Sequence, residues 1–416
     1  WHGGLAGRDK LITFDVGGTS ADIGLVVGGT FAEATARDTW IGGFPVMTPM
    51  IDIHTIGAGG GSIAHLDAGG GFRVGPASAG AFPGPAAYGR GGTEPTVTDA
   101  HVVLGRLDPE NFLGGAMSLD VAASRAVIDD LAAKLNLAPD EAAAGVLAIA
   151  NANMANAIHT RTVQKGLDPR EFSLVAFGGA GPLHGAEVAR ILGVPEVIVP
   201  PYPGITSAVG LLTTDLKYDA IRTAFQTSTA PDLPAIAAAF DDMQAALDAQ
   251  LAEDGVAAED RVFERSGDLR YVGQGYELRA AFPAGTLDQA GVQSAFEAFA
   301  AAHKDEYGHD FPDSPIEIVN LRLTAIGKTP RMADPATAAA SGPPTPLRSV
   351  EVAFRVGGAM QRFETPVYRR TDIGACETLA GPAIVVQTDT TTVAPPGSTV
   401  TADTAGNLVI RLEQDA

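Results

Sequence analysis

Two short, mostly apolar runs lie near the start of the chain, and a glycine-rich polar stretch separates them. The runs are residues 11–14 and 23–26, and the stretch between them is Asp15-Val-Gly-Gly-Thr-Ser-Ala-Asp22. Two runs of strand length around a tight glycine turn are typical of a β-hairpin. Gly17 and Gly18 have no Cβ, so their backbone can turn sharply or approach another group closely. The pattern therefore predicts a hairpin here.

Longer stretches of the chain show helical or strand periodicity. Apolar residues recur at helical spacing, and the helices that this predicts cover residues 99–107, 122–135, 139–166, 233–253 and 296–307. Continuous or alternating apolar residues predict strands at 172–177, 194–200, 261–282 and 316–326. From residue 349 onward, short alternating runs separated by glycine and proline predict an all-β region.

Chain length and composition indicate more than one domain. At 416 residues, of which 45% are hydrophobic, the chain exceeds one ordinary core. The sequence changes character near residue 225, and a stretch rich in Pro, Ala, Ser and Thr at 329–346 has the composition of a linker. We expect an α/β core at 1–225, an α+β domain at 226–330 and an all-β domain at 345–416.

The chain is strongly acidic, with a net charge of −21 and a pI near 4.6. Such a chain repels nucleic-acid phosphates and anionic membranes, so we expect neither as a partner. The sequence has no run of about 18 apolar residues and no signal-peptide pattern, so a cytoplasmic location is expected. A single cysteine, Cys376, excludes an internal disulfide framework and a cysteine-rich zinc site.

The predicted hairpin carries groups suited to phosphate and metal. Asp15 and Asp22 place two carboxylates at its mouth, where they could bind a hydrated Mg²⁺. Backbone N–H groups of the glycine turn, together with the hydroxyls of Thr19 and Ser20, are typical surroundings of a phosphate. The alternative is a plain glycine turn between two solvated aspartates, because Gly and Asp are common in all turns.

A second glycine loop, Gly59-Gly60-Gly61, also offers consecutive N–H groups to an anion. Asp52 and His54 precede it, and we consider them as metal or substrate contacts. The alternative for His54 is a half-buried structural position on a strand.

A third glycine stretch, Gly178-Gly179-Ala180-Gly181, follows the continuous apolar strand and precedes a helix. A strand, a glycine turn and a helix N-terminus together form an anion- or nucleotide-binding unit, although the spacing is not that of a Rossmann motif. His184 could line this site or cap the turn. Upstream, the basic residues at 159–165 could face a phosphate or simply complement a helix dipole.

The hairpin resembles the phosphate hairpin of the actin, sugar-kinase and acetate-kinase superfamily. The whole chain resembles the hydantoinase A / 5-oxoprolinase family, which includes the β subunits of acetone carboxylases. The motifs that carry this resemblance are Asp52–Ile63, Arg73–Gly80, Pro83–Gly89, Glu94–Ala100, Val175–His184, Asp268–Glu277 and Gly381–Val385.

The resemblance implies an actin-like (ribonuclease H-like) ATPase core with a smaller α+β domain and a C-terminal all-β domain. It implies ATP and Mg²⁺ as cofactors, with phosphates held at residues 17–20 and the nucleoside at Gly178–Gly181. Together with the residues considered above, we expect the metal at Asp15, Asp52 and His54. Asp15 and Asp22 would be the catalytic residues.

The activity that the resemblance implies is ATP-dependent ring opening of a small cyclic amide, such as a hydantoin or 5-oxoproline, through a phosphorylated amide. The alternatives are the β subunit of an ATP-dependent ketone carboxylase and a non-catalytic nucleotide-binding scaffold. A hydantoinase B-type subunit is the expected partner. The family carries another such hairpin near its N-terminus, so this chain, which has one and no internal repeat, is expected to lack an N-terminal half.

Overall fold

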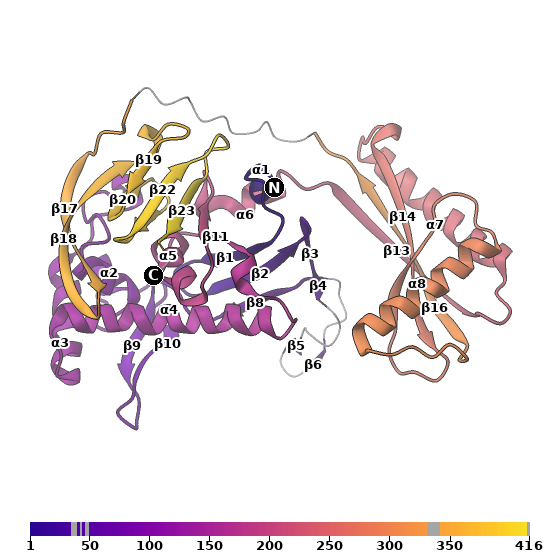
Figure 1. Ribbon diagram of the computed structural model, residues 1–416, viewed down its shortest axis with the longest axis horizontal. Coiled ribbons are helices and arrows are strands. Elements are labelled where there is room, and N and C mark those ends of the chain that lie inside the picture. Colours follow the sequence, from indigo (N-terminus) through magenta and orange to yellow (C-terminus); the bar gives the residue numbers. More distant parts are fainter. Residues whose placement is uncertain (35–39, 42–43, 46–49, 331–341, 414–416) are drawn as a thin grey trace. The chain divides into compact units, whose positions relative to one another are not determined.

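The computed structural model describes residues 1–34, 40–41, 44–45, 50–330 and 342–413 (Figure 1). They form two compact units. The first contains residues 1–210 together with the chain from 342 onward, and the second contains residues 211–330. Within the described part of the chain, no helix has the length and apolar character needed to cross a membrane.

The first unit is built on a nine-stranded mixed sheet. Its strands in spatial order are β19 (Thr378–Ala380), β22 (Ser398–Ala402), β23 (Leu408–Leu412), β12 (Glu196–Val199), β11 (Ser173–Phe177), β1 (Leu11–Val16), β2 (Ala21–Val27) and β3 (Thr30–Phe31), with β8 (Ile53–Ile56) also paired to β2. The neighbours β1, β11 and β12 are parallel, and the other pairs are antiparallel. The predicted hairpin is confirmed as β1 and β2.

Helices and smaller sheets complete the first unit. The helices are α1 (His2–Leu5), α2 (Val97–Val103), α3 (Val121–Leu135), α4 (Pro139–Val163), α5 (Gly181–Leu192) and α6 (Thr206–Leu211). A four-stranded sheet contains β17 (Arg348–Val356), β18 (Ala359–Arg369), β20 (Ala383–Val386) and β21 (Thr391–Ala394), and a ribbon pairs β9 (Ser62–Leu66) with β10 (Phe72–Ser78). Two further short ribbons pair β4 (Glu33–Ala34) with β7 (Met50–Ile51) and β5 (Trp40–Ile41) with β6 (Phe44–Pro45).

The C-terminal region is not a separate β domain, contrary to the prediction for 345–416. Strand β23 pairs with β12 from Glu196↔Arg411 to Val199↔Leu408, so it extends the central sheet. Val352, Phe354 and other residues of the smaller sheet belong to the same hydrophobic core as β1 and α5. The strand patterns were correct, but alternation along a strand does not say which neighbour it pairs with. Figure 1 shows β22 and β23, in yellow, close to β11.

The second unit is a four-stranded antiparallel sheet packed against two helices. Its strands are β13 (Leu216–Thr227), β16 (Ile316–Gly327), β14 (Arg261–Tyr271) and β15 (Leu278–Phe282) in spatial order, and its helices are α7 (Leu233–Glu253) and α8 (Gln289–Tyr307). The predicted boundary near 225 falls inside β13, which pairs with β16 over most of its length and so belongs to this unit. Most of the predicted linker at 329–346 lies outside the described residues.

A buried carboxylate holds together the loops near α2. Thr96 and Asp99 form a capping box at the start of α2. The Asp99 carboxylate also accepts hydrogen bonds from the N–H groups of Ala86 and Ala87 and from the Ser124 hydroxyl, at 2.8–3.3 Å. One fully buried side chain thus anchors the short 3₁₀ helix Ala86–Tyr88, helix α2 and helix α3.

We therefore expect Asp99→Ala to lower the free energy of unfolding by about 3 kcal/mol or more, because several buried donors lose their acceptor together. Urea unfolding measures this. Asp120→Ala is the matched control, since Asp120 is an exposed helix cap that accepts one bond from Ala123, and its loss costs about 1 kcal/mol. Equal losses for the two variants would contradict the anchoring role.

Candidate functional site

Two of the predicted glycine turns lie side by side at one edge of the central sheet. Strands β1 and β11 are parallel neighbours, so their carboxyl ends meet at the same edge. The Ala180 N–H after β11 donates to Val16 O at the end of β1 (2.9 Å). A Cβ on Gly178 would lie 2.3 Å from Asp15 Oδ1, so only glycine allows this approach.

Asp15 and Asp22 face each other across the hairpin. They are direct partners in the β1–β2 register, which places both side chains on one face of the sheet with Cβ atoms about 5 Å apart. The Thr55 hydroxyl donates to Asp22 Oδ1 (2.5 Å), and the Ser207 hydroxyl donates to Asp15 Oδ2 (3.4 Å). Burial raises the pKa of Asp15, and the neighbouring charge on Asp22 raises it further.

Two half-buried carboxylates at this distance repel each other, and a cation between them would relieve the repulsion. Their oxygen atoms are the donor type that Mg²⁺ prefers, and Mg²⁺ is commonly held by one or two carboxylates plus phosphate oxygens and water. No cluster of three or more potential metal ligands occurs among the described residues. The pair therefore fits an ion shared with a phosphate rather than an all-protein metal site.

The loop Gly59–Gly61 packs against the turn of the hairpin and forms hydrogen bonds with it. Gly60 N donates to Gly17 O (3.0 Å), Gly61 N donates to Gly18 O (2.6 Å), and Gly59 N donates to the Ser62 hydroxyl (2.9 Å). All three N–H groups are thus occupied, which contradicts the expectation that they hold a phosphate. A Cβ on Gly59 would lie 2.7 Å from Thr19 N, so these glycines are needed for close backbone packing.

Asp52 and His54 do not join Asp15. Asp52 forms ion pairs with Arg161 and Lys165 from the end of α4, which therefore neutralise a carboxylate rather than face a phosphate. Strand β2 separates β8 from β1, and Asp22 is paired with Thr55, three residues beyond Asp52. At about 3.3 Å per residue, Asp52 lies about 10 Å further along the sheet.

His54 lies opposite Ile23 in a half-buried strand position, which is the structural alternative considered for it. The predicted metal set of Asp15, Asp52 and His54 is therefore wrong in its last two members. Their closeness in sequence to a glycine loop did not reveal that another strand intervenes.

A cavity of about 300 Å³ opens between the hairpin and the 178–181 turn. Its backbone wall contains Gly17, Gly18, Gly60, Gly179 and Ala180, so the structure brings together glycines from all three predicted stretches. Its apolar wall contains Tyr88, Leu107, Phe112, Leu113, Met117 and Leu183, and its polar lining contains Arg90, Thr98, Asp108, Asn111 and residues 387–391. The rings of Tyr88 and Phe112 are 6.0 Å apart. Such a mixture of an apolar wall and a few polar groups is typical of a small-molecule site.

The C-terminal segment supplies one wall of this cavity. The Thr390 hydroxyl donates to Gly179 O (2.9 Å), and Gly204 N donates to Asp389 Oδ2 (2.7 Å). Arg370, which is half-buried, donates to Gln387 Oε1 (3.1 Å). We did not predict residues 387–391 as part of a site, because no local motif marks them. Tyr88 and Phe112 lie in long loops, a weak signal that was available in the sequence.

The carboxylate pair and the cavity lie on opposite sides of the glycine turns. Phe14 and Val16 point into the core shared with α5, so alternation along β1 directs Asp15 to the other face. Neither Asp15 nor Asp22 lines the cavity. Thr19 is exposed at the turn and lies near the Ser78 hydroxyl, and Ser20 O accepts from Gly17 N (3.0 Å).

His184 lies in a buried polar chain rather than in the cavity. Asn151 donates to Glu187 Oε2 (2.6 Å), so Asn151 Oδ1 is the acceptor for His184 Nδ1–H (2.7 Å). His184 Nε2 then accepts from His101 Nε2–H (3.4 Å). An ion pair between Glu187 and Arg106 (2.9 Å) ends the chain. This chain of hydrogen bonds links α5 to α4 and α2. His184 therefore neither lines the site nor caps the glycine turn, which were the two roles considered for it.

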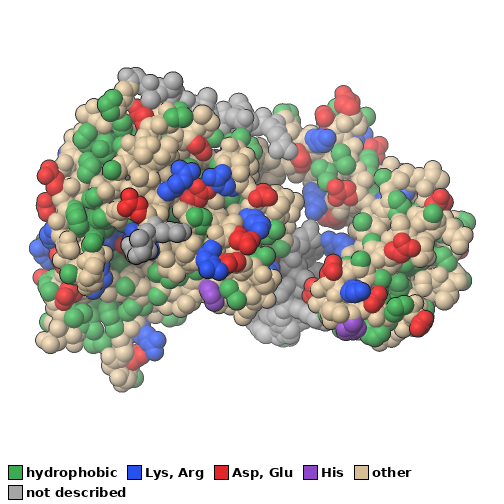
Figure 2. Space-filling model, in the orientation of Figure 1, with side chains coloured by type: hydrophobic (Ala, Val, Ile, Leu, Met, Phe, Trp, Pro, Cys, Tyr) green, Lys and Arg blue, Asp and Glu red, His purple; other side chains and the backbone are tan. Residues whose placement is uncertain are grey.

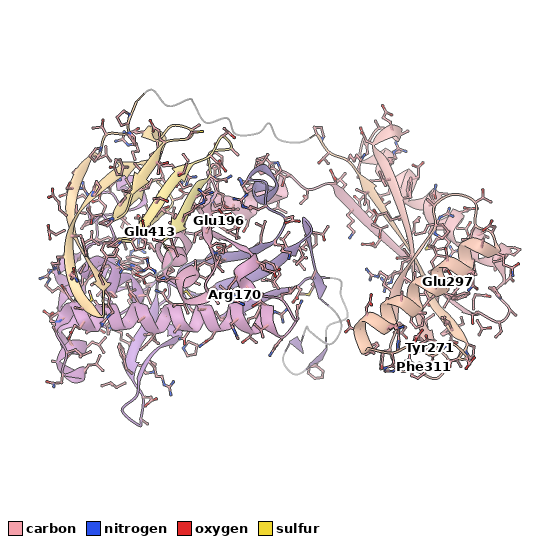
Figure 3. All side chains as sticks on the ribbon, in the orientation of Figure 1. Arg170, Glu196, Tyr271, Glu297, Phe311 and Glu413 are labelled. Carbon is pink, nitrogen blue, oxygen red and sulfur yellow. The ribbon has the colours of Figure 1, made fainter. Side chains whose placement is uncertain are left out.

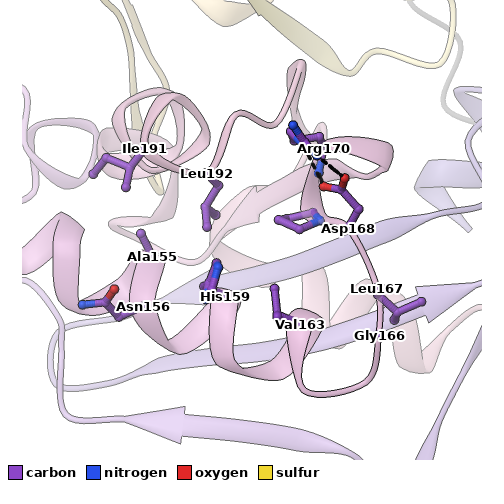
Figure 4. Close-up of a pocket in the computed structure, with 11 residues that line it drawn as sticks. Ala155, Asn156, His159, Val163, Gly166, Leu167, Asp168, Arg170, Ile191 and Leu192 are labelled. Carbon is purple, nitrogen blue, oxygen red and sulfur yellow. Dashed lines mark hydrogen bonds and ion pairs between the residues drawn. The ribbon is translucent and has the colours of Figure 1, made fainter.

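A larger groove of about 720 Å³ lies elsewhere, between the end of α4, residues 166–170 and the end of α5 (Figure 4). Its charged residues Asp168 and Arg170 are paired with each other at 2.6 Å, as the dashed lines in Figure 4 show. His159 and Ile191 complete a surface that contains none of the three predicted glycine turns. The smaller cavity is therefore the better candidate site.

Comparison with known proteins gives a family for the chain. The hydantoinase/oxoprolinase family matches residues 2–220, and the C-terminal domain of hydantoinase/oxoprolinase proteins matches residues 224–411. Caprolactamase subunit alpha of Pseudomonas jessenii is 34% identical over 95% of this chain and 57% of its own length. The acetophenone carboxylase gamma subunit of Aromatoleum aromaticum is 32% identical over 97% and 56%, and 5-oxoprolinase 1 of Arabidopsis thaliana is 32% identical over 99% and 33%.

Two solved structures share the fold. Nucleotide-free acetone carboxylase superposes with a TM-score of 0.84 at 25% identity, over 99% of this chain and 59% of that one. The ATP-dependent caprolactamase from Pseudomonas jessenii superposes with a TM-score of 0.80 at 32% identity, over 99% and 60%. In every case the chain spans less than two thirds of the relative's length.

The buried state of His184 predicts a pH dependence of stability. Burial lowers the pKa of His184 from 6.5 to about 4, so between these values the unfolded chain binds more protons than the folded one. The free energy of unfolding should therefore fall by about 2 kcal/mol from this group between pH 7 and pH 5. Urea unfolding at both values measures the difference. The difference in unfolding free energy between the two pH values should shrink in His184→Asn. It should persist in the control His65→Asn, because His65 is exposed. An unchanged difference in His184→Asn would show that His184 does not cause the pH dependence.

Proposed function

The chain belongs to the hydantoinase/oxoprolinase family, and we propose that it is the ATP-binding part of an enzyme that opens a small cyclic amide by hydrolysis. The observation that carries the proposal is the Asp15–Asp22 carboxylate pair beside two glycine turns that share a cavity. Relatives named as a caprolactamase subunit and as 5-oxoprolinases support a cyclic amide, of the hydantoin or 5-oxoproline type, as the substrate class.

The sheet order supports an actin-like core. In the order β3-β2-β1-β11-β12, three antiparallel strands are followed by two strands parallel to β1. This is the arrangement of one ribonuclease H-like half, and an actin-like ATPase holds ATP between two such halves. The chain would supply one half, and the N-terminal half would come from the rest of the protein or from another chain. A hydantoinase B-type subunit is the proposed partner, since relatives are named as subunits.

Each side of the glycine turns would have its own task. Asp15 and Asp22 would hold Mg²⁺, which would neutralise charge on the transferring phosphoryl group. Gly17 N–H closes the hairpin on Ser20 O, so Gly18 and Thr19 are the turn residues best placed to contact the phosphates. The nucleoside would occupy the cavity, with its base against Tyr88 and Phe112 and its sugar at Gly179 and Ala180.

The proposed reaction has two steps. The γ-phosphoryl group of ATP moves to the amide oxygen and ADP leaves, which makes the amide carbon a better electrophile. Two water molecules then complete the hydrolysis. The first adds to that carbon and the C–N bond breaks, which opens the ring to an amine and an acyl phosphate; the second cleaves the acyl phosphate to a carboxylate and free phosphate. The chain's part is to hold the phosphates in line with the acceptor, where positioning and charge stabilisation supply most of the rate.

A second candidate is a subunit of an ATP-dependent ketone carboxylase, which the superposition on acetone carboxylase favours. A non-catalytic nucleotide-binding scaffold is the third. Phosphate release from ATP by the complete complex, with lactams, hydantoins, or ketones plus bicarbonate, separates the three. If a ketone plus bicarbonate stimulated phosphate release and no lactam or hydantoin did, the amide proposal would be overturned. Binding of ATP with no substrate-stimulated phosphate release would indicate the scaffold.

Replacing Asp15 by Asn in the complete enzyme should reduce ATP-dependent turnover by about 100-fold or more, because one electrostatic group at the phosphoryl site is lost. The fold should persist, since the amide removes the repulsion between Asp15 and Asp22. Asp67→Asn serves as the control, because Asp67 pairs with Arg73 at the surface. If Asp15→Asn turned over at the rate of Asp67→Asn, the hairpin would have only a structural role.

Substitutions at the neighbouring glycines Gly178 and Gly179 test whether the cavity binds the nucleoside. A Cβ on Gly179 has only Asp389 O nearby, at 3.8 Å, so Gly179→Val should keep the melting temperature and weaken ATP binding by filling the cavity. Gly178→Val should instead lower the melting temperature, because its Cβ would meet Asp15 and Val16 and its φ is +79°. Calorimetry of ATP binding beside a melting curve measures both. Normal affinity in folded Gly179→Val would exclude the nucleoside from this cavity.

A further inference from the structure

One end of the second unit is formed by two connections that lie together. They are the 271–277 turn between β14 and β15 and the 307–315 loop between α8 and β16. The turn belongs to the motif Asp268–Glu277, to which the proposed ATP-dependent reaction gives no task. We call these two connections the aromatic tip.

Rings run from the core of the unit to the surface of the aromatic tip. Tyr271 contacts the fully buried Phe299 and also Phe311, with centroids 5.0 and 5.1 Å away. His303 contacts Tyr307 (4.7 Å), and Tyr307 contacts Tyr276 (5.4 Å). Figure 3 labels Tyr271 and Phe311, which lie at the same end of the unit.

Hydrogen bonds fix the two connections to each other. Phe311 N donates to the Tyr271 hydroxyl (3.0 Å), and Val272 N donates to Pro315 O (2.9 Å). His303 donates from Nδ1 to His309 O (2.8 Å) and accepts at Nε2 from Gln274 (2.9 Å).

The polar residues of the motif hold the base of the turn. Asp268 pairs with Arg322 (2.7 Å), and Arg270 bridges Glu317 (2.8 Å) and Glu277 (3.1 Å). The backbone of the aromatic tip is therefore fixed before any partner arrives, which lowers the ordering cost of binding.

The fixed tip presents apolar side chains to solvent. Val272 is 52% exposed, Phe311 41% and Tyr276 37%. Large aromatic side chains of this kind, held in one conformation, are the usual anchors of protein interfaces.

The surroundings of these rings are acidic. Four carboxylate residues lie in or beside the 307–315 loop, with one lysine among them: Asp305, Glu306, Asp310 and Asp313, with Lys304. Figure 2 shows acidic side chains on the visible face, interspersed with Lys and Arg, and the chain carries a net charge of −21, so repulsion acts on an approaching acidic surface. A second copy of this chain would bring one acidic rim against another, which disfavours self-association through the aromatic tip.

We propose that the aromatic tip docks a partner protein that presents an apolar side chain ringed by lysine or arginine. The proposal rests on the proposed function in one respect, because it takes that partner to be the B-type subunit of the same enzyme. Phe311 and Tyr276 fill the apolar contact, and the acidic rim orients the partner and speeds its association.

The test uses the complete protein and the purified B-type subunit, with binding measured by calorimetry at 0.05 M and 0.5 M salt. Phe311→Ala removes an exposed ring but keeps the backbone bond to Tyr271, so the fold should persist; a melting curve checks this. The dissociation constant should rise at least tenfold. Ile221→Ala is the matched control, because Ile221 is 51% exposed in the middle of β13; it should change affinity less than twofold.

A charge-reversed variant tests the rim. Asp310→Lys with Asp313→Lys should weaken binding at 0.05 M salt, and most of that loss should disappear at 0.5 M because surface charges are screened. Equal affinities of Phe311→Ala and Ile221→Ala, absence of a wild-type complex, or self-association that Phe311→Ala abolishes would each overturn the docking proposal. ATP binding measured on the same samples tests the function separately: its absence in the wild type contradicts the proposed function, whereas normal ATP binding with an unaffected complex contradicts the aromatic tip alone.

Discussion

The site depends on backbone segments that pack where no side chain fits. The hairpin turn at Gly17 and Gly18 bonds to Gly60 and Gly61 on one side, and Val16 bonds to the 178–181 turn on the other. A Cβ at Gly59 or Gly178 would meet backbone or carboxylate atoms at less than 3 Å. Because three chain segments converge on one turn, the positions of the carboxylate pair and the cavity are set by the same contacts.

Buried polar groups hold the helices that surround this turn. Asp99 fixes the loop that carries Tyr88, and the chain from Arg106 to His101 joins α2, α4 and α5. Such networks are costly when incomplete and strongly orienting when satisfied. The side of the proposed nucleoside cavity that is formed by Tyr88, α2 and α5 is thus held rigidly. Another side comes from residues 387–391, about 200 residues further along the chain than the 178–181 turn.

The sequence predicted what local patterns encode. The hairpin, the long helices and the strand-to-helix turn after Phe177 follow from periodicity, capping residues and glycine positions, and the structure contains them. Longer-range features were not predictable in this way. Nothing local indicates that β23 would join β12, that Asp52 would meet Arg161, or that Thr390 would bond to Gly179. The Asp15–Asp22 pair was foreseen because a tight hairpin places both residues opposite each other.

The central sheet draws strands from both ends of the chain, and this has a consequence during synthesis. When residues 211–330 have left the ribosome, the second unit has all of its strands and helices and can fold. The first unit still lacks β19, β22 and β23, so the edge of β12 stays open until residue 412 has been made. An unpaired strand edge invites wrong pairing. The nascent protein therefore passes through a stage in which its second unit can be folded while its first unit still has an open strand edge and can misassemble. Chaperone binding would be most useful during this stage.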